Sequence, residues 1–593
     1  MACLTDGAPG PDVRIESPDM PPRAASRPAP IVKKPPAAAP RWLRPLILAL
    51  SAFALMGWFS TEVSDSDTWW LLKSGQYIWQ NHKLPVPDPF AYTTYMGKPA
   101  FPGEEHMRDF DLTHEWLSEV VFYLVYAAGG FAGLVLFRAA LLTGFCGAVG
   151  LVAFHRSKGF YRALGAAFLA ATIADKFRSD RPFLIGFLML ALVVAALEYR
   201  RWLWALPPMF VVWANMHGGF FLGWAPLGAY CAEALFLRWR GRPVADERRL
   251  WLVSAASILA SGLNPNGFLP VTILATYRNS ALQGALWEWQ HTALWPLEAF
   301  GVLLFAGAAA LLWARSKARV SDWLLFLAFA AAGIWAVRNV LLIGLIAPIV
   351  IASYIPWKPT VPVLAAVLVL VGAGPQIARG SVFQLRAAEW KYPARAADFL
   401  LAHNVSGPMF NTYDYGGYLM WRMWPHERVF IDGRALNESV YLDYRRMAGN
   451  ADSTGGKSGD ELLNQYGIQV IVMDGFEFTS GDPYLLPAAL SDPSQKEWKL
   501  VYQDAQAVVF MRQPPPGVAP LNSLDALTSM ESQCAEHIQH LPGQPRCARG
   551  LGDLFARIGD TARARRWMAF YLEHRVEPDP EADGIYRRLL GTR

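Results

Sequence analysis

Two carboxylates separated by one residue, Asp65 and Asp67, lie in the segment EVSDSDTWWLL, which follows the first long apolar run at residues 43–60. Two acidic groups beside a low-dielectric membrane repel each other and lose solvation, and both effects raise a pKa unless a cation or donor compensates. Such a pair suits a general base, a metal ligand or a site for a cationic transition state, although two solvated loop aspartates would have the same spacing. We expect Trp69 and Trp70, which follow directly, at the membrane interface.

The composition indicates a multi-pass membrane protein. The chain has 593 residues, 53% of them hydrophobic, and several runs of 15 or more residues carry almost no charge, which is enough to approach or cross a bilayer. The net charge of +5 is modest, and the basic residues lie in short loops between the apolar runs. This distribution indicates topology and argues against a nucleic-acid partner.

The apolar runs predict a polytopic α-helical domain over residues 41–377. Residues 1–40 are rich in Pro, Ala and Arg, which predicts a disordered tail, and their basic residues favour a cytoplasmic N-terminus. A long first outer loop over 62–130 ends in an amphipathic segment that we expect to lie flat on the membrane, because the span after it then ends in basic residues on the cytoplasmic side. With the first run, the expected spans number about eleven: 131–154, 162–175, 183–198, 202–216, 218–237, 249–263, 298–314, 322–337, 339–356 and 361–377.

An odd number of spans places everything after residue 377 in the periplasm. Residues 378–515 contain a helix at 392–403 and short apolar runs at 408–411, 428–432, 469–474 and 507–512, a pattern typical of an α/β domain. Residues 516–593 resemble a tetratricopeptide-type helical tail, which cannot bury its own face and could dock on the α/β unit or on a protein partner. Cys534 and Cys547 flank a Pro/Gly-bearing turn in this tail and are expected to form a disulfide in the periplasm, the alternative being two buried free thiols.

Polar residues gather where the expected spans end on the outer side. Each group alone fits a structural ion pair, but so many on one side predict a polar cavity that opens outward. These residues are Asp175, Arg178, Asp180, Arg181, Asn215, His217, Asn264, Asn266, Glu288, Arg338 and Asn339.

The layout resembles the GT-C superfamily of integral-membrane glycosyltransferases, which use lipid-phosphate-linked sugars. Shared features are a cytoplasmic N-terminus, an acidic motif after the first span and a long first outer loop with an interfacial helix. Two later segments, Asn411–Tyr418 and Val429–Asn437, resemble a diverged WWDYG region of oligosaccharyltransferase catalytic subunits. Thr412 and Tyr413 stand where that motif has its two tryptophans, so the contact that the family makes with the acceptor's sequon is not carried over.

The resemblance implies roles for particular residues. Asp65 and Asp67 match the acidic pair after the first span, Glu288 the glutamate of the late outer loop, and Asp414 the WWDYG aspartate. The implied catalytic residues are therefore Asp65, Asp67 and Glu288. Cations such as Arg178, Arg181 or Arg338 would neutralise the leaving phosphate. The candidate substrate-binding residues are His114, Glu115, Arg178, Arg181, Asn215, His217, Arg338, Asp414, Tyr415, Asp432 and Arg434. A divalent metal, Mg²⁺ or Mn²⁺, on Asp67 stays open, because the sequence identifies no third ligand.

The resulting hypothesis is an inverting glycosyltransferase at the periplasmic face of a bacterial inner membrane. It would take a polyprenyl-phosphate-linked sugar and an acceptor that is a lipid, a glycan or a protein. One alternative is a lipid or polysaccharide transporter or flippase, which would be expected to show inverted repeats or matched broken helices; the sequence has no internal repeat. Another is a non-catalytic envelope scaffold, in which Asp65, Asp67 and Glu288 would be replaceable.

Overall fold

The computed structural model describes residues 40–591, except 243, 278–279, 281, 283–286, 357–373, 375–376 and 379. It divides into two compact units, Met1–Leu50 and Ser51–Arg593. The expected tail at 1–40 and most of the expected span at 361–377 lie outside the described residues.

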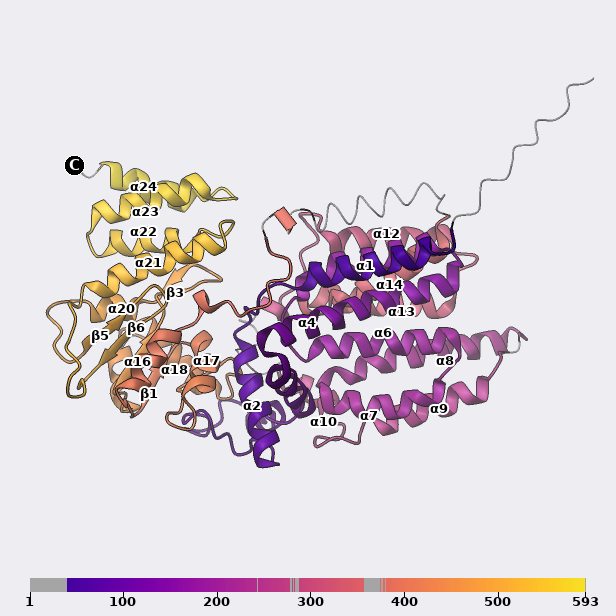
Figure 1. Ribbon diagram of the computed structural model, residues 1–593, viewed down its shortest axis with the longest axis horizontal. Helices are drawn as coiled ribbons and strands as arrows, with labels where there is room; N and C mark the ends of the chain where they lie inside the picture. Colours follow the sequence, from indigo (N-terminus) through magenta and orange to yellow (C-terminus); the bar gives the residue numbers. More distant parts are fainter. Residues whose placement is uncertain are drawn as a thin grey trace, which may run out of the picture. The chain divides into compact units, whose positions relative to one another are not determined.

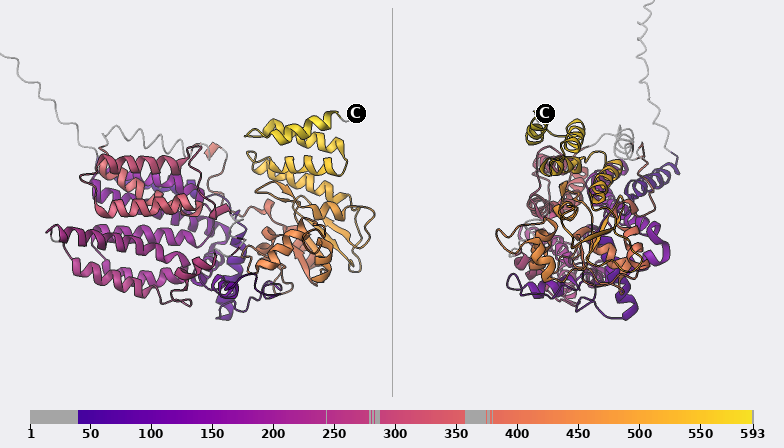
Figure 2. Two further views of the ribbon diagram at one scale, coloured as in Figure 1. Left: turned by 180° about the vertical axis from the view of Figure 1, so that it is seen from behind. Right: turned by 90° about the vertical axis from the view of Figure 1, so that its left-hand side faces the viewer.

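The first half of the chain is helical because its sequence is a series of long apolar runs. Helices α4, α5, α6 and α14 pack on one another, and α12 and α13 pack on α14; these helices lie side by side in Figures 1 and 2. The apolar helices are α1 (Leu43–Phe59), α4 (Trp116–Ser157), α5 (Phe160–Ala174), α6 (Phe183–Tyr199), α7 (Leu206–Met216), α8 (Trp224–Trp239), α9 (Glu247–Ala260), α10 (Leu269–Tyr277), α12 (Ala299–Trp313), α13 (Val320–Trp335) and α14 (Leu341–Tyr354).

Three helical stretches are long and apolar enough to cross a membrane: Glu104–Ser157, Gly218–Trp239 and Val337–Tyr354. Five further apolar helices have 10–17 residues: Leu43–Phe59, Phe183–Tyr199, Leu203–Met216, Ala299–Trp313 and Val320–Trp335. These findings support a membrane protein, whereas the count of about eleven spans and their orientation stay predictions.

The longest helix, α4, consists of two segments. Gly130 breaks it with φ 59° and ψ −152°, a conformation that glycine adopts without the penalty of a Cβ atom. The break falls between the amphipathic segment and the span that the sequence predicts at residue 131. The two segments are therefore separate helices that meet at a kink, and their orientation to the membrane stays a prediction.

An ionic network joins the C-terminal end of α6 to α4, α8 and α13. Glu198, in the last turn of α6, accepts from Arg319 at 2.7 Å, and Arg319 also binds Glu233 of α8 at 3.0 Å. Arg156 of α4 donates to Asp322 of α13, with 2.7 Å between Nη1 and Oδ1. These charges are paired, as charges within a helical bundle must be to offset their desolvation.

Two short helices, α2 (Asp67–Asn81) and α3 (Glu104–Asp111), lie between α1 and α4. The indoles of Trp69 and Trp70 do not reach an interface, so that expectation is wrong: both side chains are buried, at 3% and 8% exposure. Trp69 instead packs edge-on against Tyr392 and Tyr418, with ring centroids 4.9 and 4.7 Å away. Trp69 therefore joins α2 to the later part of the chain.

The second half contains a four-stranded sheet in the order β1-β2-β6-β5, in which only β1 and β2 are parallel. Its buried core includes Phe410, Ile471 and Phe510, one from each of three neighbouring strands. The strands are β1 (Met409–Asn411), β2 (Val470–Met473), β5 (Lys499–Gln503) and β6 (Val508–Met511), with a separate pair β3 (Phe476–Glu477) and β4 (Asp482–Pro483); the helices are α16 (Ala394–Ala402), α17 (Tyr413–Met423), α18 (Glu438–Ala448), α19 (Gly459–Gln465) and α20 (Leu485–Leu490).

One expected strand is not a strand. Residues 428–432 form only an isolated bridge between Val429 and Ala91. The reason is the tertiary contact: this run is covered by the loop before α3, where Tyr92 N donates to Val429 O and Thr93 binds Phe430 O. Its apolar residues Val429 and Phe430 are buried, as the pattern indicates, but outside the sheet.

Four consecutive helices end the chain: α21 (Asp525–His540), α22 (Arg546–Arg557), α23 (Thr561–His574) and α24 (Pro580–Gly591). They stack one on the next in Figures 1 and 2. Cys534 of α21 and Cys547 of α22 form the predicted disulfide, with Cα atoms 5.7 Å apart. The bridge closes the turn between the first two helices of the tail.

Candidate functional site

The segment that carries Asp65 and Asp67 is held in an extended conformation by the chain after the apolar helices. Val63 pairs with Ala387 in a parallel bridge, and Ala388 N donates to Val63 O at 2.8 Å. Asp65 Oδ1 accepts from Asp67 N at 3.0 Å, which fixes the start of α2. Asp67 is the first residue of that helix, where the helix dipole favours a negative charge.

Arg181 joins the two carboxylates. Its Nε and Nη2 donate to Asp65 at 2.7 and 3.1 Å, and Nη2 lies 2.9 Å from Asp67 Oδ2. Arg181 comes from the loop between α5 and α6, which is 116 residues from Asp65 in the sequence. Hydrogen bonds that also pair charges are the strong ones, so Arg181 fixes Asp65 firmly, whereas its contact with Asp67 is an ion pair.

Glu288 and Arg338 complete the cluster. Glu288 Oε2 lies 3.8 Å from Arg181 Nη1 and its Oε1 lies 3.8 Å from Arg338 Nη1. Arg338 stacks over the ring of Trp289 at 4.4 Å, a cation–π contact. The structure thus gathers Asp65, Asp67, Arg181, Glu288 and Arg338 from four separate parts of the sequence, and both arginine side chains remain about a third exposed.

The pKa values of the two aspartates are shifted in opposite directions. Burial would raise the pKa of Asp65, but the charge and hydrogen bonds of Arg181 outweigh it and hold that pKa below its usual range. Burial raises the pKa of Asp67 to about 7; Arg181 opposes the shift, while the charges of Asp65 and Glu288 add to it. Two neighbouring carboxylates whose environments separate their pKa values can act as an ionised stabiliser and a proton acceptor near neutral pH.

The donor set does not fit a divalent cation on Asp67. Mg²⁺ and Mn²⁺ need several oxygen ligands at short range, and the described residues contain no group of three or more His, Cys, Asp or Glu side chains arranged to hold a metal. Asp65 already accepts two hydrogen bonds from Arg181, and Asp67 Oδ2 forms an ion pair with the same guanidinium. The positive charge between these carboxylates is a guanidinium.

A buried ion pair braces both loops of the cluster. Arg138 of α4 donates to Asp180 at 2.7 Å, and both side chains are fully buried. The same guanidinium contacts Thr61 O on the segment that leads to Asp65. Asp180 directly precedes Arg181, so one buried arginine holds the approaches to both halves of the Asp65–Arg181 pair. The sequence analysis missed Arg138, although it is the one charged residue in the expected span 131–154, and such residues are functional candidates by default.

The region that resembles WWDYG packs on α2 through glycines. A Cβ atom on Gly417 would lie 3.0 Å from Ser66 O, and one on Gly433 would lie 2.3 Å from Asp67 Oδ1. The backbone at Gly433 therefore forms one wall beside the Asp67 carboxylate. Asp414, in the first turn of α17, is half-buried nearby, and burial raises its pKa while Lys391 lowers it.

The side chains of Asp432 and Arg434 pair with each other and not with the residues of the Asp65–Arg181 cluster. Arg434 donates to Asp432 at 2.8 Å through Nε and 2.7 Å through Nη2, and its Nη2 lies 3.4 Å from Asp88. The three side chains are at most 3% exposed. This geometry braces the turn at Gly433 and leaves these residues little access to a substrate.

A second polar group surrounds the start of α4. His114 Nε2 lies 3.3 Å from Glu115 Oε2, and the His114 and His217 rings are 6.3 Å apart. Asn215 accepts from Trp116 Nε1 at 2.9 Å and donates to Leu263 O at 2.8 Å. Both ends of the Asn215 amide are thus bonded within the protein, which ties the amphipathic segment to the end of α7.

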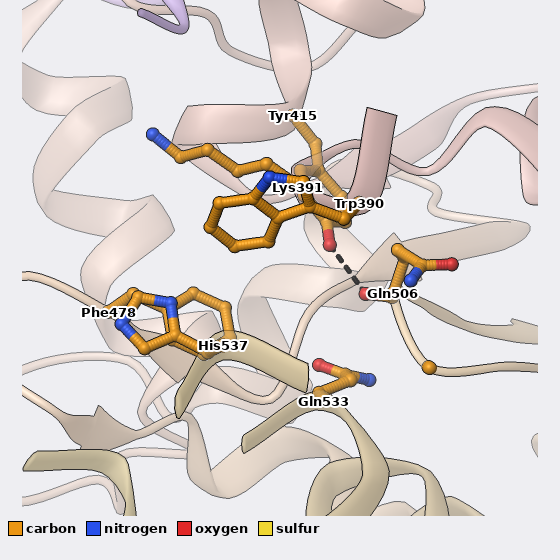
Figure 3. A pocket seen from close by; sticks show the side chains of 8 residues that line it. Trp390, Lys391, Tyr415, Phe478, Gln506, Gln533 and His537 are labelled. Carbon is orange, nitrogen blue, oxygen red and sulfur yellow. Dashed lines mark hydrogen bonds between the residues drawn. The ribbon is translucent and has the colours of Figure 1, made fainter. Parts of the chain in front are cut away.

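Arg178 and Tyr415 lie apart from the Asp65–Arg181 cluster. Arg178 Nε pairs with Asp175 at 3.2 Å. The Tyr415 hydroxyl donates to Gln506 O at 2.5 Å and points into a different, small cavity, shown in Figure 3. That cavity is lined by Trp390, Lys391, Tyr415, Phe478, Ala505, Gln506, Gln533 and His537.

Two residues that line the cavity of Figure 3, Trp390 and Lys391, also bind the segment before Asp65. Lys391 Nζ donates to Ser64 O at 2.9 Å, and Trp390 Nε1 donates to Glu62 at 3.0 Å. The ring of Trp390 also stacks on that of His540 of α21, with centroids 4.3 Å apart and an angle of 1° between the ring planes. The residues before Asp65 are therefore held in part by the C-terminal helices.

No family model matches this chain, and no curated protein sequence matches it. Among solved structures, its fold is similar to that of the oligosaccharyltransferase of Archaeoglobus fulgidus, which was crystallised tethered through a disulfide bond to an acceptor peptide containing the NVT sequon. The two chains share 12% sequence identity with a TM-score of 0.47, and the likeness covers 83% of this chain and 77% of the archaeal one. A likeness at this level identifies no residue role.

Proposed function

We propose that this protein is a membrane-embedded glycosyltransferase that uses a polyprenyl-phosphate-linked sugar. The observation that carries the proposal is the cluster of Asp65, Asp67 and Glu288 around Arg181, with Arg338 beside it. A carboxylate able to take a proton near neutral pH lies next to two partly exposed guanidinium groups. Transfer from a lipid phosphate needs both: a base for the acceptor and cations for the departing phosphate.

The chemistry is a displacement at the anomeric carbon. An acceptor O–H or N–H gives its proton to Asp67, and its oxygen or nitrogen bonds to the anomeric carbon. The bond from that carbon to the phosphate oxygen breaks, and the electron pair leaves with the polyprenyl phosphate. Arg181 and Arg338 stabilise the negative charge on the leaving group, and attack from the opposite face inverts the anomeric centre.

The proposal includes a location and a topology. The site would face the periplasm of a bacterial inner membrane, with residues 1–40 in the cytoplasm and the α/β domain (378–515) and helical tail (516–593) in the periplasm. The disulfide between Cys534 and Cys547 supports this placement, because such bonds persist outside the cytosol. A reporter that is active only in the cytoplasm, fused after Arg593, should be silent; a strong signal would contradict the topology.

The test of function combines lipid identification with an assay of transfer. Mass spectrometry of the detergent-purified protein should find a polyprenyl-phosphate species, and the protein should release polyprenyl phosphate from a labelled lipid-linked sugar in a membrane extract that contains acceptors. Asp67→Asn should lower that release about 10²–10⁴-fold, the usual effect of losing a general base. Asp398→Asn is the matched control, because it breaks an exposed ion pair with Arg422.

Three outcomes separate the alternatives. Bound lipid without release, in wild type and variant alike, would favour a transporter or flippase. Neither lipid nor release, together with normal growth of cells carrying Asp67→Asn, would favour a scaffold. Equal release by wild type and Asp67→Asn would refute Asp67 as the base.

A further inference from the structure

We infer that Arg181 is the resident cation of this site, so that the three carboxylates around it bind no divalent metal and the reaction requires none. Whether the site binds a divalent metal is independent of the proposed function, whereas the statement that the reaction requires no metal rests on the proposed function.

Three acidic groups converge on Arg181. Asp65, Asp67 and Glu288 carry the oxygen ligands that Mg²⁺ or Mn²⁺ prefer, and all three are paired with the guanidinium of Arg181. The shortest N···O distances are 2.7 Å to Asp65, where the contact is a hydrogen bond, and 2.9 and 3.8 Å in the ion pairs with Asp67 and Glu288. A metal at about 2.1 Å from the same oxygens would occupy the space of those N–H groups.

Arg181 cannot easily move away from the carboxylates. Its neighbour Asp180 is fixed by the fully buried Arg138 at 2.7 Å. Arg181 itself binds Asp65 through two nitrogens. A planar guanidinium can make this two-point contact with a carboxylate, whereas the ammonium group of lysine cannot. A metal would have to break this contact and leave a guanidinium unpaired in a largely buried site, which is costly.

The charge of the site also disfavours a metal. Arg181 and Arg338 supply two positive charges against three carboxylates, so a further dication would leave the site with excess positive charge. Nη1 of Arg181 lies 3.8 Å from Glu288, too far for a hydrogen bond. Because the Arg181 side chain is 31% exposed, its Nη1 group can donate to a phosphate oxygen.

The decisive experiment measures Mn²⁺ binding to the full-length protein in detergent, by electron paramagnetic resonance of free Mn²⁺. Wild type should show no saturable site up to about 1 mM, the weak end of carboxylate sites for divalent cations. Arg181→Ala removes the guanidinium that separates the three carboxylates, so that their side chains can move together around a cation. It should bind Mn²⁺ at least tenfold more tightly than wild type.

Three further variants make the result specific. Arg181→Gln keeps more of the side-chain volume and should also gain binding, whereas Arg181→Lys keeps the charge and should not. Arg181→Ala combined with Asp65→Asn should lose the gained site. Melting curves show which variants are folded, and the wild-type titration decides the question even if Arg181→Ala and Arg181→Gln are not.

The inference fails if wild type binds Mn²⁺ at a saturable site below about 1 mM and loses that binding in Asp67→Asn. It also fails if folded Arg181→Ala and Arg181→Gln gain no site. In the transfer assay, treatment with EDTA should leave more than half of the wild-type activity. A tenfold loss that added Mn²⁺ or Mg²⁺ restores would overturn the metal-independent reaction, whereas an absence of transfer under every condition would count only against the proposed function.

Discussion

Replacing Arg138 by methionine should destabilise the protein strongly, because it removes one half of a fully buried ion pair. Arg138 and Asp180 are both 0% exposed, and their donor and acceptor atoms are 2.7 Å apart. Methionine fills much of the volume but carries no charge, so Asp180 would stay buried without its cation. Breaking such a pair from one side costs about 3–5 kcal/mol.

Further contacts of the same guanidinium support the upper part of this range. Arg138 also bonds to the backbone oxygens of Thr61 and Phe59, which would lose a buried donor. Asp180 Oδ1 has no hydrogen-bond partner in the described part of the chain even with Arg138 present. The carboxylate therefore has no second donor to compensate for the loss.

The double variant Arg138→Met/Asp180→Leu separates the pair from its surroundings. Replacing both partners by apolar residues removes the uncompensated charge, so most of the stability should return, to within about 1.5 kcal/mol of wild type. Arg422→Met, which breaks an exposed ion pair with Asp398, is the control and should cost less than about 1 kcal/mol. Thermal unfolding in detergent, followed by tryptophan fluorescence, measures all four proteins.

The reasoning would be refuted if Arg138→Met melted within a degree of wild type, or if the double variant were less stable than Arg138→Met. Activity provides a second readout, because Arg138 holds the segment before Asp65 and the residue before Arg181. In the double variant, transfer should stay reduced after stability has recovered. Full recovery of transfer would show that the brace has no role in positioning the site.

Three other predictions follow from the site and the tail. Because the pKa of Asp67 is raised to about 7 and a general base must be ionised, transfer should rise with pH between 6 and 8 with a midpoint near 7; a flat pH–rate profile would contradict this role. Gly433→Ala would place a Cβ 2.3 Å from Asp67 Oδ1 and should lower transfer by about 10²-fold with little change in melting temperature, whereas Gly129→Ala, with open space around it, should have no effect. Replacing Cys534 and Cys547 by serine should reduce stability by about 3 kcal/mol in denaturant unfolding, and alkylation of both thiols in the unreduced wild type would exclude the bridge.

The local pattern of the sequence was sufficient to predict many elements. The apolar runs became helices because a helix makes all the backbone hydrogen bonds of an apolar segment within that segment. The break at Gly130 follows from glycine's conformational freedom. The disulfide between Cys534 and Cys547 was predictable because a short turn brings the two cysteines together. In each case the signal and its consequence lie within a few tens of residues.

The assembly of the site depends on distant pairings that only the tertiary structure decided. Asp65 and Arg434 were both candidates on chemical grounds, yet Asp65 meets Arg181 at 116 residues' separation in a partly open cluster, while Arg434 meets Asp88 at 346 residues' separation in a buried pair. A charged residue has the same sequence signature in either role. Which partner neutralises it, and how much water remains, is set by how the helices and the α/β region pack, because desolvation and Coulomb energy depend on distance in space and not on position along the chain.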